Sequence, residues 1–522
     1  MLVDPDTKSL ILKVDDPFEL RALIPKSKTL DHPKYNFALK HDMDATRLLR
    51  NMGYDVPTPI FTDYDWPGKY SPFDHQREMA DFQISNWRGF NLSEMGTGKT
   101  YAALWGADYM MRICMVGKCL VISPLSTLET VWTRDIFDIL MHRVATVVHG
   151  SREKRRKMLA VDADFYILNH DGVKIKEIAE AIRMRKDINY VIVDEGSMFR
   201  YHDTDKFKLL RKMIRPEVGI WWMTGTPTPK EPTDAWAQVR VVNPANVPQF
   251  HGQFKRDTMI QVSTYKWVPK KNAHKTVFQA MQPAIRFRKA DCLDLPPLTF
   301  EDRQAQLSKE QQRHIKELRD EMATVVNNKL LTAVNAADKM NKLRQILCGA
   351  VKKSADKEEY ITIPHAPRLN TLIEGIEGAS AKVIVVVPFK GIIRSLATEL
   401  QERDYSVGVL NGDVPIGKRN AIIRSFKEEV DPHIALCHPK VMSHGINMVE
   451  ADTIIFYAPI YSNDEYQQVI QRFNRYGQKR KMTVLRIAAH PIEWEVYRAV
   501  DTQNFMQENL LDLYRNFVLD HH

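Results

Sequence analysis

The sequence has few cysteines and no long apolar run. Its five cysteines, spread over 522 residues, form no Cys-x-x-Cys pair, so neither a zinc site nor a disulfide framework is expected. The longest apolar stretch, Val383 to Val387, has the length of a strand, and the first residues, MLVDPDTKSL, lack the regions of a signal peptide. These absences predict a cytoplasmic protein with no membrane contact.

The composition is that of a globular chain with a modest excess of basic residues. Hydrophobic residues make up 44% and charged residues 27%, which excludes a disordered or collagen-like chain. A chain of 522 residues is too long for one core, so we expect two to four domains. Lys and Arg number 74 against 65 Asp and Glu, and this excess favours a polyanionic partner.

Basic residues gather between His251 and Lys289. This segment contains nine Lys and Arg residues and a single acid, Asp257, with Phe254, Tyr265 and Trp267 interleaved. Cationic side chains pair with phosphates, and aromatic rings stack on bases. The segment therefore predicts a surface that follows a nucleic-acid backbone.

The most informative segment is Glu94-Met95-Gly96-Thr97-Gly98-Lys99-Thr100. Small residues expose backbone N–H groups that wrap a phosphate, the lysine reaches the β and γ phosphates, and the threonine hydroxyl ligates Mg²⁺. The segment follows an apolar stretch and precedes a run of helical composition, Tyr101 to Met111. We predict that the whole segment cradles ATP, with Lys99 on the phosphates and Thr100 on the metal.

An acidic pair follows a short apolar run downstream of this loop. Tyr190 to Val193 has the composition of a buried strand, and Asp194-Glu195-Gly196-Ser197 comes directly after it. A nucleotide hydrolase needs one acid for Mg²⁺ and a second to activate water. We assign the metal to Asp194 and the catalytic base to Glu195.

Short apolar runs that end in polar turns form two groups. The first group is 120–122, 165–168, 191–193 and 220–223, and the second is 383–387, 434–437, 454–457 and 484–487. This α/β periodicity predicts two similar lobes, each a parallel sheet flanked by helices. Between them, Ser308 to Leu347 contains neither Pro nor Gly, which predicts a helical brace.

These patterns divide the chain into five parts. We expect a small N-terminal α/β module at 1–70, with a helix near Asp42 to Met52, and lobes at 71–295 and 361–490. The helical insertion lies between them, at 296–360. The amphipathic C-terminal part, 491–522, is expected to pack as a helix on the second lobe.

Two arginines near the end of the second lobe have the spacing of catalytic cations. ATP hydrolysed between two lobes needs a positive group from the opposite lobe to neutralise the transferring phosphate. In Gln468 to Gln478, Arg472 and Arg475 are one helical turn apart, so we expect them to share a helical face. They would complete the site when the lobes close.

The order of these motifs resembles that of the superfamily-two helicases, in detail the Swi/Snf-type DNA translocases, including the compact members found in phages. The resemblance covers about residues 71–490 and implies RecA-like lobes. Phe73-Asp74-His75-Gln76 resembles the adenine-recognition motif, which implies that Gln76 binds ATP. Thr224-Gly225-Thr226-Pro227 resembles the motif that couples hydrolysis to lobe movement. Ser123-Pro124-Leu125-Ser126, with Thr127 beside it, resembles a motif that contacts the DNA backbone.

The resemblance continues in the second half of the chain. Lys382 to Lys390 is similar to the opening strand of the second lobe, and Met340 to Ile346 to the helical insertion. His438 to Asn447 resembles a motif that touches DNA and nucleotide, implying DNA contacts from His438, Ser443 and His444 and ATP contacts from Gly445 and Asn447. Arg472 and Arg475 match the arginine fingers.

Three positions depart from the family pattern. Ser197 stands where many relatives have His, which weakens the expected link between the acidic and coupling motifs. Ser93 replaces a smaller residue, and Lys230 stands where many relatives have Asn. None of these changes removes a catalytic group.

The resemblance implies an ATP- and Mg²⁺-dependent motor, monomeric, that is stimulated by DNA and acts on duplex or branched DNA. Replication or recombination proteins are the expected partners, and the host cytoplasm is the location if the chain is phage-encoded. Two alternatives stay open: a helicase that separates strands at forks or RNA–DNA hybrids, and a nucleotide-dependent DNA-binding switch without translocation. The first 70 residues resemble small substrate-recognition modules, with a structural cap as the alternative.

Overall fold

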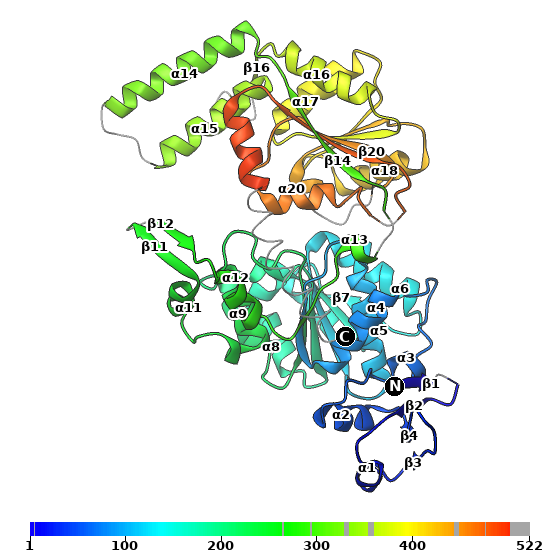
Figure 1. The fold of residues 1–522 in the computed structure, drawn as a ribbon. Coiled ribbons are helices and arrows are strands. Elements are labelled where there is room, and N and C mark those ends of the chain that lie inside the picture. Colours follow the sequence, from blue (N-terminus) through cyan, green and yellow to red (C-terminus); the bar gives the residue numbers. More distant parts are fainter. Residues whose placement is uncertain are drawn as a thin grey trace. The chain divides into compact units, whose positions relative to one another are not determined.

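The computed structural model describes residues 1–4, 6–263, 266–292, 295–327, 333–352, 360–442, 448–475 and 477–501. The chain divides after Cys292 into two compact units, which Figure 1 shows as a ribbon. Within the described ranges, none of the helices combines the length and the apolar character that crossing a bilayer demands. The same residues contain no group of three or more His, Cys, Asp or Glu side chains placed to hold a metal ion.

The first 51 residues form a small antiparallel sheet with its own core. Its strands, in the order β1-β2-β4-β3, are β1 (Leu2–Asp4), β2 (Ser9–Leu12), β3 (Ser27–Thr29) and β4 (Phe37–Lys40). Two helices accompany them, α1 (Pro17–Leu23) and α2 (Met43–Asn51). Helix α2 begins where predicted, because the Asp42 carboxylate accepts a hydrogen bond from Ala45 N. Leu10, Phe37 and Leu49 fill the core between sheet and helices.

The rest of the first unit is a seven-stranded sheet in which every pair is parallel. Its order is β13-β5-β10-β9-β6-β8-β7. The strands are β5 (Arg88–Asn91), β6 (Lys118–Ser123), β7 (Ala145–Val147), β8 (Phe165–Asn169), β9 (Ile188–Val193), β10 (Gly219–Met223) and β13 (Ala284–Ile285). All four strands predicted for the first lobe are present.

Alternating side chains of these strands fill two separate cores. Leu120, Ile122 and Trp222 face one core, whereas Val121 and Trp221 face the other, as the two-residue period of a strand requires. Helices α3 (Ile60–Asp63), α4 (Asp74–Ser85), α5 (Lys99–Arg112) and α6 (Arg134–Ile139) cover the second face. The first face is covered by α7 (Arg152–Ala160), α8 (Lys176–Met184), α9 (Asp205–Met213) and α10 (Asp234–Val242), as Figure 1 shows for α8 and α9.

The first unit ends in a helical segment that carries a hairpin. This segment contains α11 (His251–Thr258), α12 (Ala273–Ala280) and α13 (Lys289–Cys292), with the antiparallel strands β11 (Met259–Ser263) and β12 (Lys266–Pro269) between α11 and α12. Short helical turns occupy five loops: η1 (Leu125–Thr127), η2 (Leu128–Thr133), η3 (His170–Lys174), η4 (Gly196–Phe199) and η5 (Pro244–Asn246).

The second unit is built on a six-stranded sheet, again with only parallel pairs, in the order β14-β21-β20-β17-β19-β18. The strands are β14 (Leu298–Gln304), β17 (Lys382–Val386), β18 (Val407–Leu410), β19 (Ile434–Cys437), β20 (Ala451–Phe456) and β21 (Met482–Ala488). The four strands predicted for the second lobe are all present. Two parallel sheets flanked by helices confirm the predicted fold class.

Helices flank this second sheet as well. They are α16 (Ala366–Glu377), α17 (Lys390–Gln401), α18 (Ile416–Glu428), α19 (Pro439–Met442) and α20 (Asn463–Ile470). Two longer helices, α14 (Lys309–Asn327) and α15 (Ala333–Cys348), precede a hairpin of β15 (Ala350–Lys352) and β16 (Tyr360–Thr362). Ile315 and Leu318 of α14 pack against Ile346 and Leu347 of α15, inside this unit.

Strand β14 is where the structure departs from the predicted helical insertion. Residues 298–304 pair along their whole length with β21, and Arg486 Nε donates to Asp302 Oδ1 at 2.6 Å. The strand is at the sheet edge and mostly exposed, so it carries charges where a buried strand would carry apolar residues. Helices α14 and α15 confirm the helix predicted over Ser308 to Leu347 in its described part, whereas the end of the insertion forms strand β15 and the start of β16.

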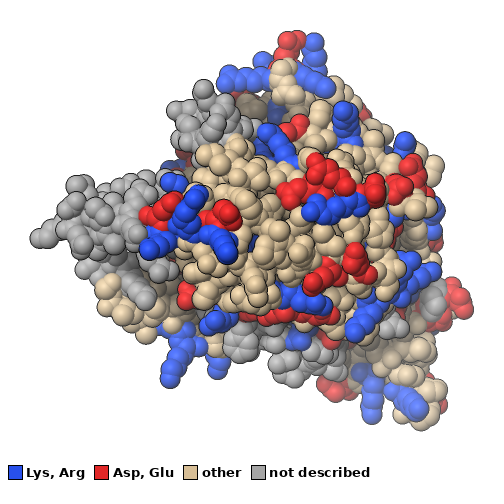
Figure 2. Space-filling model, turned by 90° about the horizontal axis from the view of Figure 1, so that it is seen from above, with Lys and Arg blue, Asp and Glu red and all other residues tan. Residues whose placement is uncertain are grey.

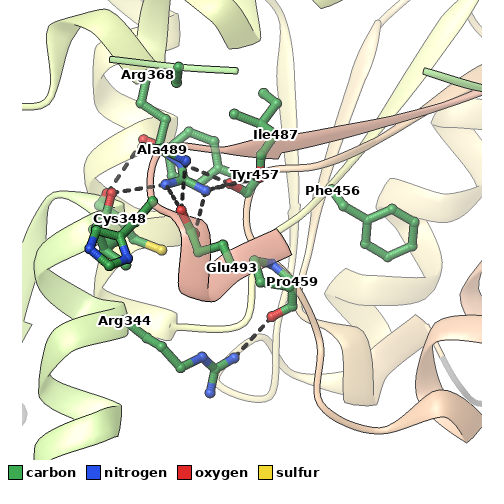
Figure 3. A network of polar contacts seen from close by, with 12 residues as sticks. Arg344, Cys348, Arg368, Phe456, Tyr457, Pro459, Ile487, Ala489 and Glu493 are labelled. Carbon is green, nitrogen blue, oxygen red and sulfur yellow. Dashed lines mark hydrogen bonds and ion pairs between the residues drawn. The ribbon is translucent and has the colours of Figure 1, made fainter. Parts of the chain in front are cut away.

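The described part of the C-terminal segment is a helix from 491 to 501, and it packs on the second sheet. Its Glu493 forms a buried ion pair with Arg368 of α16, with Nη2 and Oε1 2.8 Å apart (Figure 3). The same guanidinium donates to the carbonyls of Tyr457, Leu347 and Ile487. One ion pair therefore joins this helix to α15, α16 and the ends of two central strands.

Candidate nucleotide site

Four of the predicted motifs lie at one edge of the first sheet. Strands β5, β10, β9 and β6 are neighbours in that order, and they run into the phosphate loop, the coupling motif, the acidic motif and the DNA-backbone motif respectively. The strand ends are level, since Met223 pairs with Asn91, and Val193 pairs with both Trp222 and Ile122. The carboxyl edge of a parallel sheet is where α/β proteins bind ligands.

The phosphate loop links β5 to α5 and depends on two glycines. Gly96 and Gly98 have φ angles of +87° and +76°, a region that side chains with a Cβ rarely adopt. Helix α5 begins at Lys99, so the N–H groups of its first turn face the loop. This strand, loop and helix sequence is the arrangement that the motif predicted.

The adenine-motif residues brace this loop from the first turn of α4. Gln76 Nε2 donates to Gly98 O at 3.3 Å, while Gln76 Oε1 accepts from Phe73 N at 2.9 Å. Burial lowers the pKa of His75, and its Nε2 donates to Thr97 O at 2.9 Å. The motif identified for base recognition thus also fixes the backbone of the phosphate loop.

Two basic residues from the 251–289 segment bind Glu94, the first residue of the phosphate loop. Arg286 Nη2 donates to Glu94 Oε1 at 3.4 Å, and Lys289 N donates to Glu94 Oε2 at 2.9 Å. Both side chains are buried, with exposed fractions of 3% and 4%. The prediction of a phosphate-tracking surface therefore does not hold for these two residues, because both are buried; Arg286 holds Glu94 through its guanidinium and Lys289 through its backbone N–H. Their spacing in the sequence gave no sign of this role.

The Lys99 ammonium lies inside the loop. Its Nζ donates to Ser93 O at 2.6 Å and to Glu94 O at 2.9 Å. These carbonyls hold the charge at the start of the loop, beside the N-terminus of α5. The lysine is thus positioned at the cradle rather than extended into solvent.

The acidic motif has an unusual backbone and two supports that sequence reasoning missed. Glu195 has a φ of +49°, an uncommon conformation for a residue other than glycine and one that clusters at functional sites. The fully buried Trp132 donates from Nε1 to Asp194 Oδ2 at 3.1 Å, and His170 Nε2 donates to Asp194 O at 2.8 Å. A lone Trp and a lone His carry no pattern that identifies these roles.

The coupling motif packs directly on its neighbours. A Cβ placed on Gly225 would lie 3.5 Å from Met95 N, and one on Gly196 only 1.9 Å from the Trp222 indole nitrogen. The acidic motif therefore contacts the strand of the coupling motif through Gly196, although Ser197 replaces the usual His. Beyond the motif, Asp234 accepts from Lys230 N at 2.8 Å, and burial raises the pKa of this carboxyl to about 6.

These residues fit ATP and a divalent cation. The donor set contains a glycine-shaped cradle that a Cβ would fill, a helix N-terminus, a lysine and a carboxylate oriented by an indole N–H. Such a set is suited to phosphate oxygens and to a hard cation. Thr100 and Asp194 would hold Mg²⁺, and Lys99 the phosphates.

The predicted DNA contacts of the first unit lie on the turn after β6. The Ser123 side chain is fully buried, Ser126 is half-buried, and Thr127 Oγ1 donates to Pro124 O at 2.9 Å. Leu125, 56% exposed, is the residue that this turn presents to solvent. DNA binding by this motif stays a prediction.

The second unit carries the predicted cations. Arg472 is buried, and its Nε donates to Met442 O at 2.9 Å, while Arg475 is half-buried. The expectation of a shared helical face is wrong, because α20 ends at Ile470 and the buried Phe473 draws the following turn into the core. Burial lowers the pKa of His438, which follows β19. Ser443, His444, Gly445 and Asn447 lie outside the described residues.

Two family models match the chain. The SNF2-related domain matches residues 75–356, more than half of the sequence, and the helicase conserved C-terminal domain matches residues 367–477. The chain belongs to the SNF2-related family. Both matches fall on the segments whose order of motifs carried the resemblance.

Several relatives of this SNF2-related protein are known. It is 24% identical over 443 residues to an ATP-dependent helicase of Mycoplasma genitalium, covering 83% of this chain and 40% of that protein. An ATP-dependent DNA helicase of Arabidopsis thaliana is 24% identical, with 81% of this chain and 60% of that protein covered. The chain thus spans 40% and 60% of the length of these two curated relatives.

A solved structure also matches. It is the SWI2/SNF2 ATPase core of Sulfolobus solfataricus in complex with dsDNA, at 18% identity and a TM-score of 0.42, covering 86% of this chain and 96% of that chain.

Proposed function

We propose that this SNF2-related protein is a DNA-stimulated ATPase that translocates on duplex or branched DNA. One observation carries the proposal: the phosphate loop, the acidic motif and the coupling motif meet at one edge of a parallel sheet. The contact of Gly225 with the phosphate loop gives a direct path from the nucleotide to the coupling motif. A protein that only bound a nucleotide would need no such path.

Each residue has a role in this proposal. Lys99 and the N–H groups of the loop bind the phosphates, Gln76 holds the loop and the base, and Glu195 orients the attacking water. Asp194, fixed by Trp132, and Thr100 hold Mg²⁺, which supplies charge neutralisation on the transferring phosphate when bound. Arg472 would support the turn from which Arg475 reaches the phosphate, since its own Nε is bonded to Met442 O.

The DNA would be held through its backbone, by the turn at Ser123 to Thr127 and by the segment from His438 to His444. Contacts of this kind give little sequence specificity and weaken as salt rises. Gly445 and Asn447 would contact ATP from the second unit.

The rate of ATP hydrolysis tests the proposal. We expect it to rise at least about tenfold when linear duplex DNA is added, because a motor couples turnover to its track. A rate that no DNA changes would instead support the alternative of a nucleotide-dependent switch. Single-stranded, forked and four-way DNA at equal concentration would rank the preferred substrate.

A displacement assay separates translocation from strand separation. We expect the protein to displace a third strand from a triplex while leaving a linear duplex intact. Unwinding of a linear duplex without triplex displacement would favour the strand-separating helicase.

The origin, oligomeric state, location and partners of the protein are proposed from the family resemblance alone. We propose a phage-encoded protein that acts as a monomer in the host cytoplasm, with replication or recombination proteins as partners. Measuring its mass in solution, with and without DNA, tests the monomer.

A further inference from the structure

The hairpin of β11 and β12 has no role in the nucleotide site. It follows α11 and projects beyond α11 and α12 in Figure 1. Ile260 pairs with Val268 and Gln261 with Trp267, after which a bulge shifts the register before Ser263. Bulges re-aim side chains and often stand next to functional sites.

The base of the hairpin is fixed in the core of the first unit. Phe254 of α11, Met259 of β11 and Val277 of α12 have exposed fractions of 2%, 3% and 1%. Where the hairpin closes, Lys270 N donates to Thr258 O at 2.9 Å. The base of the hairpin is therefore anchored in the core of the first unit.

The hairpin presents aliphatic side chains to solvent. Ile260 is 51% exposed and Val262, the extra residue at the bulge, is 61% exposed. Branched aliphatic residues on an exposed two-stranded hairpin are unfavourable in water and invite a partner.

The surroundings of these side chains are basic. Lys255 lies over the Trp267 ring, 4.5 Å from its centroid, and Arg256, Lys271 and Lys275 are exposed. Asp257 is the single acid from residue 251 to residue 275. By contrast, the face drawn in Figure 2 shows Lys and Arg interspersed with Asp and Glu. The positive charge around the hairpin thus favours a polyanionic partner over an uncharged β-strand of another protein.

We propose that the β11–β12 hairpin engages the branch point of DNA. Ile260 and Val262 pack on the faces of bases that become accessible where two strands part, and Lys271 and Lys275 bind the flanking phosphates. In a continuous duplex stacking covers these base faces, so packing on them costs unstacking energy that a fork or junction does not require. This inference rests on the proposed function and adds to it the DNA structure that the motor recognises.

The Ile260→Gln/Val262→Gln double variant tests the apolar contact. Both side chains are exposed, so the fold should tolerate the change; Val144→Gln, at a position 53% exposed in the same unit, is the matched control. We expect the wild type and the control to bind a fork more tightly than a linear duplex of equal length. The double variant should lose about tenfold of that preference, because a glutamine side chain does not replace the apolar contact with the bases. Its ATPase rate on linear duplex should stay within about twofold of wild type.

A fluorescent base reports the same contact directly. The emission of 2-aminopurine placed at the fork junction should rise when wild-type protein binds without ATP, and should stay low with the double variant. For the basic contacts, Lys271→Gln/Lys275→Gln should lower the salt dependence of fork binding by about one to two phosphate contacts.

The outcomes distinguish this inference from the proposed function. A wild type stimulated by linear duplex but without fork preference overturns the role of the hairpin and leaves the motor in place. Equal fork preference and junction fluorescence in the double variant overturn it as well. If no DNA stimulates the wild type, the motor itself fails.

Discussion

The two units share one architecture but carry different chemistry at the carboxyl edges of their sheets. In the first, β5 runs into a glycine-rich loop with φ angles of +87° and +76°, and β9 runs into an acidic pair. In the second, β17 continues through Val387-Pro388-Phe389 into Lys390 of α17, and β19 continues into His438. The same framework thus carries a glycine-rich loop and an acidic pair in one unit and basic side chains in the other.

Their polar interiors differ as well. Ser93, Asn91 and Thr226 of the first unit are buried around the phosphate loop. In the second unit the Arg368–Glu493 ion pair binds five chain segments together (Figure 3). Buried polar groups thus surround the phosphate loop in the first unit, whereas in the second a buried ion pair joins the C-terminal helix to the sheet.

Removing the chemistry of the first unit should have the largest effect. We expect Lys99→Ala and Glu195→Gln to lower ATP turnover by about 1,000-fold, since each removes a group that acts in the transition state. Glu195→Gln should still bind ATP, because the cradle is intact, whereas Lys99→Ala should bind it weakly. Near-normal turnover in Glu195→Gln, measured by phosphate release, would contradict its assignment as the base.

Breaking the ion pair of the second unit should destabilise that unit. Arg368→Met leaves the buried Glu493 carboxylate without its cation, which costs about 3–5 kcal/mol. Arg313→Met removes an exposed ion pair with Glu317 and should change the free energy of unfolding by less than about 1 kcal/mol. Thermal unfolding of both variants provides the measurement, and equal midpoints would refute the role of the ion pair.

The coupling segment of the first unit should respond to pH. Burial raises the pKa of the Asp234 carboxyl to about 6, above its usual value of 3.8. The folded state therefore holds this proton more tightly than the unfolded state, and the stability it contributes is full below pH 4 and lost as pH rises to 6. Relative to Asp234→Asn, wild type should lose about 2–3 kcal/mol of unfolding free energy between pH 4 and 7. Denaturant titrations at both pH values measure this difference. They would show no such change if the pKa of the Asp234 carboxyl were at its usual value.

A single methyl group in the phosphate loop should have the smallest effect of these changes. Gly98→Ala forces a side chain into the left-handed region and places its Cβ 1.9 Å from Gln76 Nε2. We expect ATP binding to weaken about tenfold, as measured with a fluorescent nucleotide. Gly252→Ala is the control, since the nearest atom to its Cβ, Arg256 Nη1, is 3.9 Å away. Equal affinities in the two variants would show that Gln76 does not brace the loop.

Sequence motifs predicted the nucleotide site because they are local. The phosphate loop and the acidic pair each follow a single strand, and a short continuous apolar run indicates a strand that is buried on both faces. The eight predicted strands are all present for the same reason.

The missed features all depend on residues distant in sequence. Trp132 and His170 support Asp194 from other loops, and Arg286 and Lys289 reach Glu94 across nearly 200 positions. Strand β14 was missed because an exposed edge strand tolerates charge, as in Glu301-Asp302-Arg303. The end of α20 before Arg472 was missed because tertiary packing of Phe473 overrides a helical pattern.

Our central proposal is that Arg475, in the second unit, neutralises charge on the transferring phosphate during ATP hydrolysis. The affinity for ADP–aluminium fluoride, a mimic of the transferring phosphate, tests it most directly when measured with duplex DNA present. We predict that Arg475→Ala binds the mimic at least about 100-fold more weakly than wild type while its affinity for ADP is unchanged, and that the exposed-site control Arg480→Ala matches wild type. Equal affinity of Arg475→Ala and wild type for the mimic would contradict the claim.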